Sequence, residues 1–134
     1  MLLFHKRRCF MLLKLDFSMD VPIYMQIRNQ IVMGIANGDL KAGEKLPPIR
    51  TLASETGINT MTVNKAYQLL KQEGFIITDR RLGAIINPER VTTKTTNLTE
   101  HKELKLLLSE FYVNGISKEE LLNACSSIYD SLAK

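Results

Sequence analysis

The stretch Leu46–Phe75 reads LPPIRTLASETGINTMTVNKAYQLLKQEGF and contains two short helical patterns joined by one turn. Pro47 and Pro48 stand where a helix can start, and the apolar residues at 49, 52 and 53 lie on one side of the first pattern. Gly57 permits the positive-φ exit that ends a helix sharply. The arrangement predicts a helix-turn-helix.

The second pattern begins after Asn59, a residue type that is favoured at the N-cap of a helix. Its apolar positions keep helical spacing and are Val63, Ala66, Tyr67 and Leu70. Its opposite face has no acidic residue and consists of Met61, Asn64, Lys65, Gln68 and Lys71. Amides suit base edges and ammonium groups suit phosphates, so we interpret this pattern as a helix that reads DNA. A solvated helix face is the alternative.

The residues after Phe75 predict a β-hairpin, or wing. Residues 75–78 form a largely β-branched run, residues 79–83 the turn, and residues 84–87 the return strand before Pro88. Arg80 and Arg81 lie at the tip, where guanidinium groups can reach phosphates or the minor groove. A solvated turn is the alternative for the tip.

A third helix is predicted upstream of the helix-turn-helix. It starts at the polar cluster Ser18–Pro22, with Pro22 near the first helical position, and ends at Asn37-Gly38. Its apolar stripe is Tyr24, Ile27, Ile31 and Ile35. The stripe can pack on the two following helices and give a three-helix core. Before it, residues 12–17 alternate loosely and predict a short strand or an extended entry.

Composition and charge allow one ordinary domain with an appendage. The chain has 134 residues, 45% of them hydrophobic, with a formal net charge of +4 and a pI of about 9.1. Residues 1–88 carry twelve basic and seven acidic side chains, whereas residues 89–134 carry six and seven. A polyanionic partner would therefore bind the upstream part.

The first eleven residues are expected to form a flexible basic arm. Their apolar runs are too short for a signal peptide or a membrane span, so no membrane partner is expected, and a start at Met11 is an alternative. Cys9 and Cys125 lack zinc-binding spacing and favour a reduced, cytoplasmic protein.

No catalytic or metal site is predicted. Ser54, Ser109 and Cys125 have no neighbouring histidine motif, and His5 and His101 are expected to be surface side chains. The residues from Asp16 onward mimic the start of a calcium loop, but Val21 and Ile27 replace its glycine and glutamate. We therefore expect neither an enzyme nor a cofactor.

Residues 89–97 are polar and threonine-rich and predict a linker, followed by two helices in residues 98–134. The first is expected to start at a capping-box-like Asn97–Glu100 and to end near Asn114-Gly115, and the second to follow a capping box at Ser117–Glu120. The apolar positions of this tail are Leu104, Leu108, Phe111, Leu121, Cys125, Ile128 and Leu132. Two such helices cannot enclose a core, so these side chains need the DNA-binding domain or a second copy as a partner. We favour a second copy, because a two-fold dimer also fits a palindromic site.

The sequence resembles the GntR family of bacterial transcription regulators. The motifs that carry the resemblance are PIYMQI at 22–27, IANGDLKAGEKLP at 35–47, RTLA at 50–53 and TVNKAYQLL at 62–70. The short tail is similar to that of the YtrA-like subfamily. The resemblance covers residues 12–88 and implies an N-terminal winged helix-turn-helix that binds a palindromic operator as a dimer, with repression common in the family. It also implies that the tail dimerises and that a small-molecule effector pocket is not expected.

The resemblance assigns DNA-binding roles by position. Arg50 matches the arginine that opens the first helix of the motif, and Arg80 matches the basic residue of the wing. The turn and the start of the reading helix match at Asn59, Thr60, Met61, Thr62 and Asn64. Thr62 lies near a helix N-terminus and is expected to bond a phosphate.

Three departures from the family pattern bear on individual contacts. Pro48 stands where a small capping residue such as serine is usual, so that hydroxyl contact is lost. Thr60 and Asn64 replace frequent arginines, which implies less bidentate bonding to guanine. Arg81 replaces a usual glycine and adds a wing cation.

The sequence thus predicts a mainly α protein with a small β-hairpin, in which a winged helix-turn-helix at 12–88 is followed by a two-helix dimerisation segment at 98–134. Its predicted function is that of a dimeric transcriptional repressor that binds a palindromic operator. The subfamily resemblance implies that it regulates a transporter operon. The predicted DNA contacts are Arg50, Asn59, Thr60, Met61, Thr62, Asn64, Lys65, Gln68, Arg80 and Arg81. The alternative is a winged-helix scaffold that binds protein and whose basic face is incidental.

Overall fold

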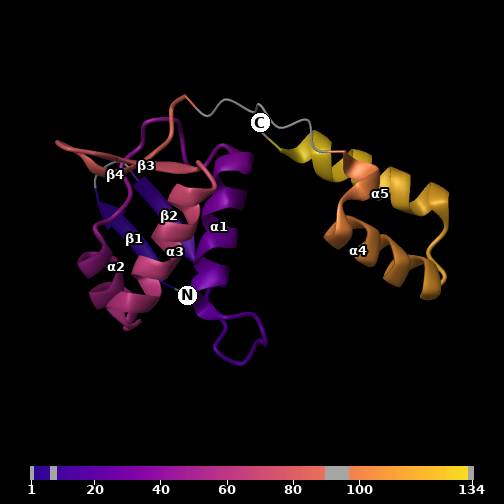
Figure 1. The fold of residues 1–134 in the computed structure, drawn as a ribbon, viewed down its shortest axis with the longest axis horizontal. Helices are drawn as coiled ribbons and strands as arrows, with labels where there is room; N and C mark the ends of the chain where they lie inside the picture. Colours follow the sequence, from indigo (N-terminus) through magenta and orange to yellow (C-terminus); the bar gives the residue numbers. More distant parts are fainter. Residues whose placement is uncertain (1, 7–8, 90–96, 133–134) are drawn as a thin grey trace. The chain divides into compact units, whose positions relative to one another are not determined.

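The structure is a computed structural model that describes residues 2–6, 9–89 and 97–132. Its elements in chain order are β1 (Leu2–Lys6), β2 (Cys9–Leu13), α1 (Ile23–Asn37), α2 (Ile49–Thr56), α3 (Thr60–Gln72), β3 (Ile76–Asp79), β4 (Gly83–Ile86), the 3-10 turn η1 (Leu98–Glu100), α4 (Lys102–Val113) and α5 (Lys118–Ser131). The chain forms two compact units (Figure 1), of which the first contains every element through β4 and the second contains η1, α4 and α5. The predicted mainly helical fold with a small hairpin is confirmed.

The core of the first unit lies between its three helices, with α3 packed against both α1 and α2 (Figure 1). Of the predicted stripe on α1, Ile27 and Ile31 are fully buried, while Tyr24 and Ile35 are half-buried. Fully buried partners from the other helices include Leu52, Val63 and Leu70. The helical periodicity of the sequence therefore identified the faces that form this core.

The first residues of the chain differ from the flexible arm that we expected. β1 and β2 pair as an antiparallel hairpin, with Leu2 opposite Leu13 and Lys6 opposite Cys9. Leu13 is fully buried in the helical core, which gives the second strand a tertiary anchor. The predicted strand or extended entry at 12–17 overlaps only the end of β2. Residues 1, 7 and 8 of the expected arm lie outside the described residues.

The loop that joins β2 to α1 is held by two glutamine side chains of α1. The buried amide of Gln26 accepts from the backbone N–H of Asp16 at 2.9 Å and donates to the carbonyls of Asp16 and Val21 at 2.8 Å each. Gln30 bonds both backbone groups of Lys14. The Asp16 carboxylate accepts from the hydroxyl and the N–H of Ser18, and these bonds lower the pKa of Asp16. The Asp16 carboxylate thus stabilises a turn within the loop itself.

The wing carries a pairing that the sequence did not indicate. β3 and β4 form the predicted hairpin, with Ile76 opposite Ile86 and Asp79 opposite Gly83. On its other edge, β4 bonds the segment 43–46: Gly43 N–H donates to Ile86 O at 2.8 Å, Ile86 N–H to Glu44 O at 2.9 Å, and Leu46 N–H to Ala84 O at 2.9 Å. The base of the wing is therefore tied to the segment that leads into α2.

The second unit contains two short helices and differs from the prediction at its start. Asn97 caps the turn η1 rather than a continuous helix, and α4 begins only after His101, whose Nδ1 accepts from Leu104 N–H at 3.2 Å. The predicted capping box of Ser117 and Glu120 is present at the start of α5. None of the described residues of the second unit is buried. Among the described residues, no helix combines the length and the hydropathy that a membrane span requires.

The turn between α2 and α3 contains a glycine whose backbone conformation can be tested by substitution. Gly57 has a φ of +70°, and a Cβ built there meets no atom within 4 Å. We expect Gly57→Ala to lower the free energy of unfolding by about 1–2 kcal/mol, because an L side chain is strained at this φ even in open space. Gly57→Asn should lose less, since asparagine tolerates the left-handed region. Urea unfolding followed by circular dichroism measures both, and equal losses would contradict the conformational explanation.

Candidate nucleic-acid interface

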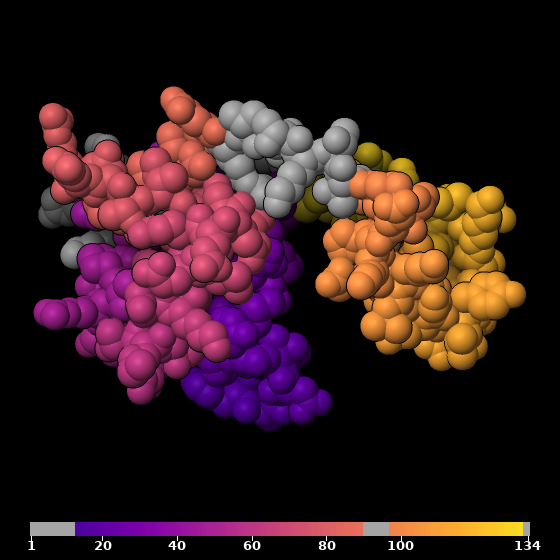
Figure 2. Space-filling model, viewed as in Figure 1, coloured from indigo at the N-terminus to yellow at the C-terminus, as the bar shows by residue number. Residues whose placement is uncertain are grey.

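The exposed face of α3 is created by the way in which the helix starts and packs. Its N-cap, Asn59, accepts from the N–H of Met61 at 2.8 Å, as predicted. The helix contains no acidic residue. The predicted polar face is exposed along its whole length at Met61, Asn64, Lys65, Gln68 and Lys71. In Figure 2, the part of the chain from α3 through the wing forms much of the visible face of the first unit.

The buried face of α3 fixes its position relative to α2. Val63, Ala66, Tyr67 and Leu70 are buried, which matches the predicted apolar positions. The Tyr67 hydroxyl also donates to the carbonyl of Pro47 at 2.6 Å. Since Pro47 lies just before α2, this bond ties the middle of α3 to the start of the preceding helix.

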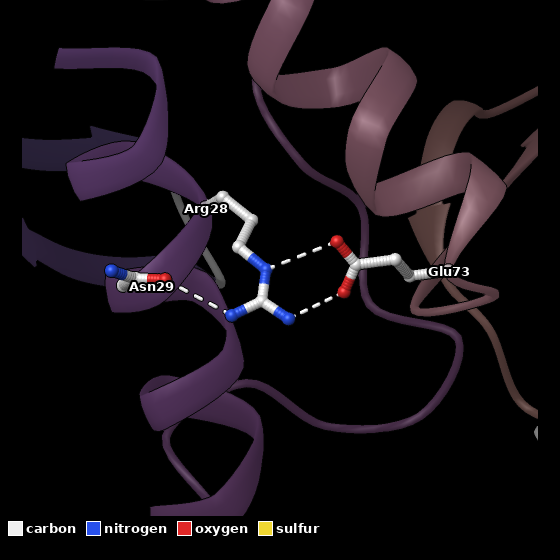
Figure 3. A network of polar contacts seen from close by, with 3 residues as sticks. All are labelled: Arg28, Asn29 and Glu73. Atoms are coloured by element: carbon white, nitrogen blue, oxygen red, sulfur yellow. Dashed lines mark hydrogen bonds and ion pairs between the residues drawn. The ribbon is translucent and has the colours of Figure 1, made fainter. Parts of the chain in front are cut away.

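A polar cluster holds the C-terminal end of α3 against α1 (Figure 3). The Arg28 guanidinium donates two hydrogen bonds to the Glu73 carboxylate, and its third nitrogen donates to the Asn29 side chain at 3.0 Å. The guanidinium also lies 5.5 Å from the centre of the Phe75 ring. Glu73 caps α3 and Phe75 precedes β3, so one arginine contacts both sides of the joint between the helix and the wing.

The start of α2 presents Arg50 to solvent. Pro48 is the N-cap residue, and no side chain caps this helix. Pro48 replaces the small capping residue that is usual in the family, and as a result no side-chain hydroxyl is present at the cap of α2. Arg50, two residues later, is exposed and forms no ion pair with the described residues.

The tip of the wing is shaped by Asp79. Its carboxylate accepts from the N–H groups of Arg81 at 2.7 Å and Leu82 at 2.9 Å, and Gly83 follows at a φ of +78°. The acidic side chain is thus occupied by the turn. The side chains of Arg80 and Arg81 are exposed.

All ten predicted DNA-contacting residues lie in the first unit on α2, on α3 and its cap, or at the wing tip. Nine of the ten are exposed, and Thr62 is partly buried. Sequence reasoning missed Tyr24 of α1, whose ring lies 4.0 Å from the Lys65 ammonium. No local signal could have found it, because the contact depends on how α1 packs on α3.

The seven predicted interface residues of the tail lie on α4, on α5 and at its C-cap. Within this unit Leu104, Leu108, Phe111, Leu121 and Leu132 are partly buried. Cys125 and Ile128 are exposed, Ile128 by 60%. Two further apolar side chains, Tyr112 and Val113, are each 82% exposed.

A cleft of about 180 Å³ lies between the start of α2, α3 and the wing, with Ile49, Tyr67, Lys71 and Thr78 among its lining residues. Pockets for drug-sized molecules usually occupy about 300–1,000 Å³. The described ranges contain no group of three or more His, Cys, Asp or Glu side chains placed to hold a metal ion.

Comparison with known proteins gives consistent matches. A family model described as "Bacterial regulatory proteins, gntR family" matches residues 23–86. The chain is 36% identical over 114 residues to the HTH-type transcriptional repressor YtrA of Bacillus subtilis. The aligned region covers 82% of this chain and 86% of that protein.

Two solved structures are similar over most of the chain. A structure titled transcriptional antiterminator from Listeria monocytogenes has a TM-score of 0.76 and 30% identity, covering 87% of this chain and 89% of that one. YtrA from Sulfolobus acidocaldarius, a GntR-family transcription factor, has a TM-score of 0.54 and 36% identity, covering 87% and 96%. With its winged helix-turn-helix and these matches, the chain belongs to the GntR family of bacterial transcription regulators, which are DNA-binding proteins and not enzymes.

Proposed function

We propose that this protein is a homodimeric transcriptional repressor that places α3 of each copy in the major groove of a palindromic operator. The observation that carries the proposal is the exposed face of α3, which lacks acidic residues and is flanked by the wing. The name of the Bacillus subtilis relative supports repression, and the resemblance to the YtrA-like subfamily favours a transporter operon as the target. Such a protein would act in the cytoplasm.

The residue types on α3 suit distinct parts of a duplex. Asn64, Gln68 and Thr60 can bond base edges, while Lys65 and Thr62 can contact phosphates. Met61 is 78% exposed at the first turn of the helix and can pack on a thymine methyl group. Asn59 lies beside this turn as the cap. Readout by these side chains needs no arginine on α3.

The arginines extend the proposed contact on both sides of α3. Arg50 at the start of α2 is assigned a base contact, and Arg80 and Arg81 at the wing tip are assigned to phosphates or the minor groove. All three are exposed cations that form no ion pair with the described residues.

We assign dimerisation to the second unit. Its apolar side chains are half-buried at most. The two helices therefore leave apolar surface exposed that they are too small to bury against each other. A second copy would cover the seven tail residues named above through a two-fold interface, and the same symmetry would match two operator half-sites.

Salt dependence tests whether the chain recognises a duplex. We expect specific binding to a duplex selected by the protein from a random pool, with log K falling by about 0.9 per neutralised phosphate as log salt rises. Fluorescence anisotropy across a salt series measures the slope. A chain with no duplex preference at any salt concentration would instead fit the protein-binding scaffold.

Arg50→Ala tests the proposed base contact. We expect a loss of about 1–3 kcal/mol in operator binding and relaxed specificity at one base pair per half-site. Arg50→Lys is the matched control, because it keeps the charge but loses the planar fork that bonds guanine. An unchanged affinity and footprint for Arg50→Ala would count against the assignment.

Ile128→Asp tests the tail as the dimer interface. A charge at this position should be costly to bury between two copies, so we expect sedimentation to detect monomer at concentrations where the unmodified chain is dimeric. Asn123→Asp on the same helix adds an exposed charge outside the predicted interface and should leave the dimer intact. A stable dimer in both variants would place the interface elsewhere.

A further inference from the structure

Lys65 is the one lysine of α3 for which the structure gives an aromatic partner. Its Nζ lies 4.0 Å from the centre of the Tyr24 ring, well within the roughly 6 Å over which a cation is attracted to a ring face. No carboxylate in the described ranges lies within ion-pair distance of this ammonium. Lys71, on the same face of α3, has no such ring contact among the described residues.

The contact lies where the proposed DNA-binding face of α3 meets α1. Tyr24 occupies the first turn of α1 and is half-buried at the end of the stripe that continues through Ile27 and Ile31. Lys65 is exposed, although its ammonium rests on the ring. Because the ring covers one side of the ammonium only, N–H donors remain available toward solvent, where a phosphate could approach.

We propose that Tyr24 is a positioning residue for Lys65, and this inference rests on the proposed function. A lysine has a flexible four-carbon stem, so binding a phosphate normally restricts many rotamers. The half-buried ring of Tyr24 favours one direction of the ammonium before DNA arrives and thereby reduces that loss. Tyr24 thus strengthens DNA binding through Lys65 without touching the duplex.

A double-mutant cycle on the full-length chain tests the proposal. The variants are Tyr24→Leu, Lys65→Met and the combination, and the probe is a labelled duplex selected by the unmodified protein from a random pool. We expect Tyr24→Leu to weaken binding about three- to tenfold when Lys65 is present. In the Lys65→Met background, which should itself reduce the salt slope by about one, the same change should have less than about a twofold effect.

Conservative variants separate positioning from a structural role. Tyr24→Phe keeps the ring face and should stay within about twofold of the unmodified chain, and Lys65→Arg should preserve the coupling because a guanidinium also stacks on aromatic rings. Fluorinated phenylalanines at position 24 keep the shape of the ring while weakening its negative face, so affinity should fall stepwise with fluorine number even if Tyr24→Leu does not fold.

Equal losses from Tyr24→Leu with and without Lys65, tighter binding by Tyr24→Leu, or no trend with fluorination would overturn the inference. These results leave duplex binding by the unmodified chain intact, so they do not affect the proposed function. Absence of duplex binding by the unmodified chain would overturn both.

Discussion

Burial of one side of α3 organises both the core of the first unit and the surface that it exposes. Val63, Ala66, Tyr67 and Leu70 are inside the core, and because a helix repeats every 3.6 residues, Asn64, Lys65 and Gln68 between them face outward. The positions that pack the protein thereby determine which side chains a duplex could meet. The fold and the proposed DNA contacts are therefore two faces of one helix.

Three further contacts fix α3 along its length. The bond from Tyr67 to the Pro47 carbonyl relates it to α2, Tyr24 of α1 contacts its Lys65 side chain, and Arg28 holds Glu73 at its end. Arg28 also contacts the Phe75 ring, so the wing is oriented from the same point. A helix held at several points can present side chains with little rearrangement, which favours selective binding.

The features that could be predicted from the sequence are those that depend on residues close together in the chain. Helical periodicity identified the three helices and their buried faces, Asn59 and Ser117 marked helix starts, and the β-branched runs located the wing. The pairing of residues 43–46 with β4, the Arg28–Glu73 pair and the Tyr24–Lys65 contact were not predictable, because each joins segments brought together only by tertiary packing. His101 was missed for another reason, since histidine is not among the preferred capping residues. The DNA contacts and the dimer interface remain predictions.

The pairing of residues 43–46 with β4 has a consequence for how the protein behaves in a crowded solution. Exposed strand edges invite pairing with other chains and can start aggregation. In the described wing sheet both edges of β4 are engaged, by β3 on one side and by residues 43–46 on the other. The outer edge of β3 extends over only 4 residues, Ile76–Asp79. A hairpin that must project from the domain thus offers little template for unwanted strand addition.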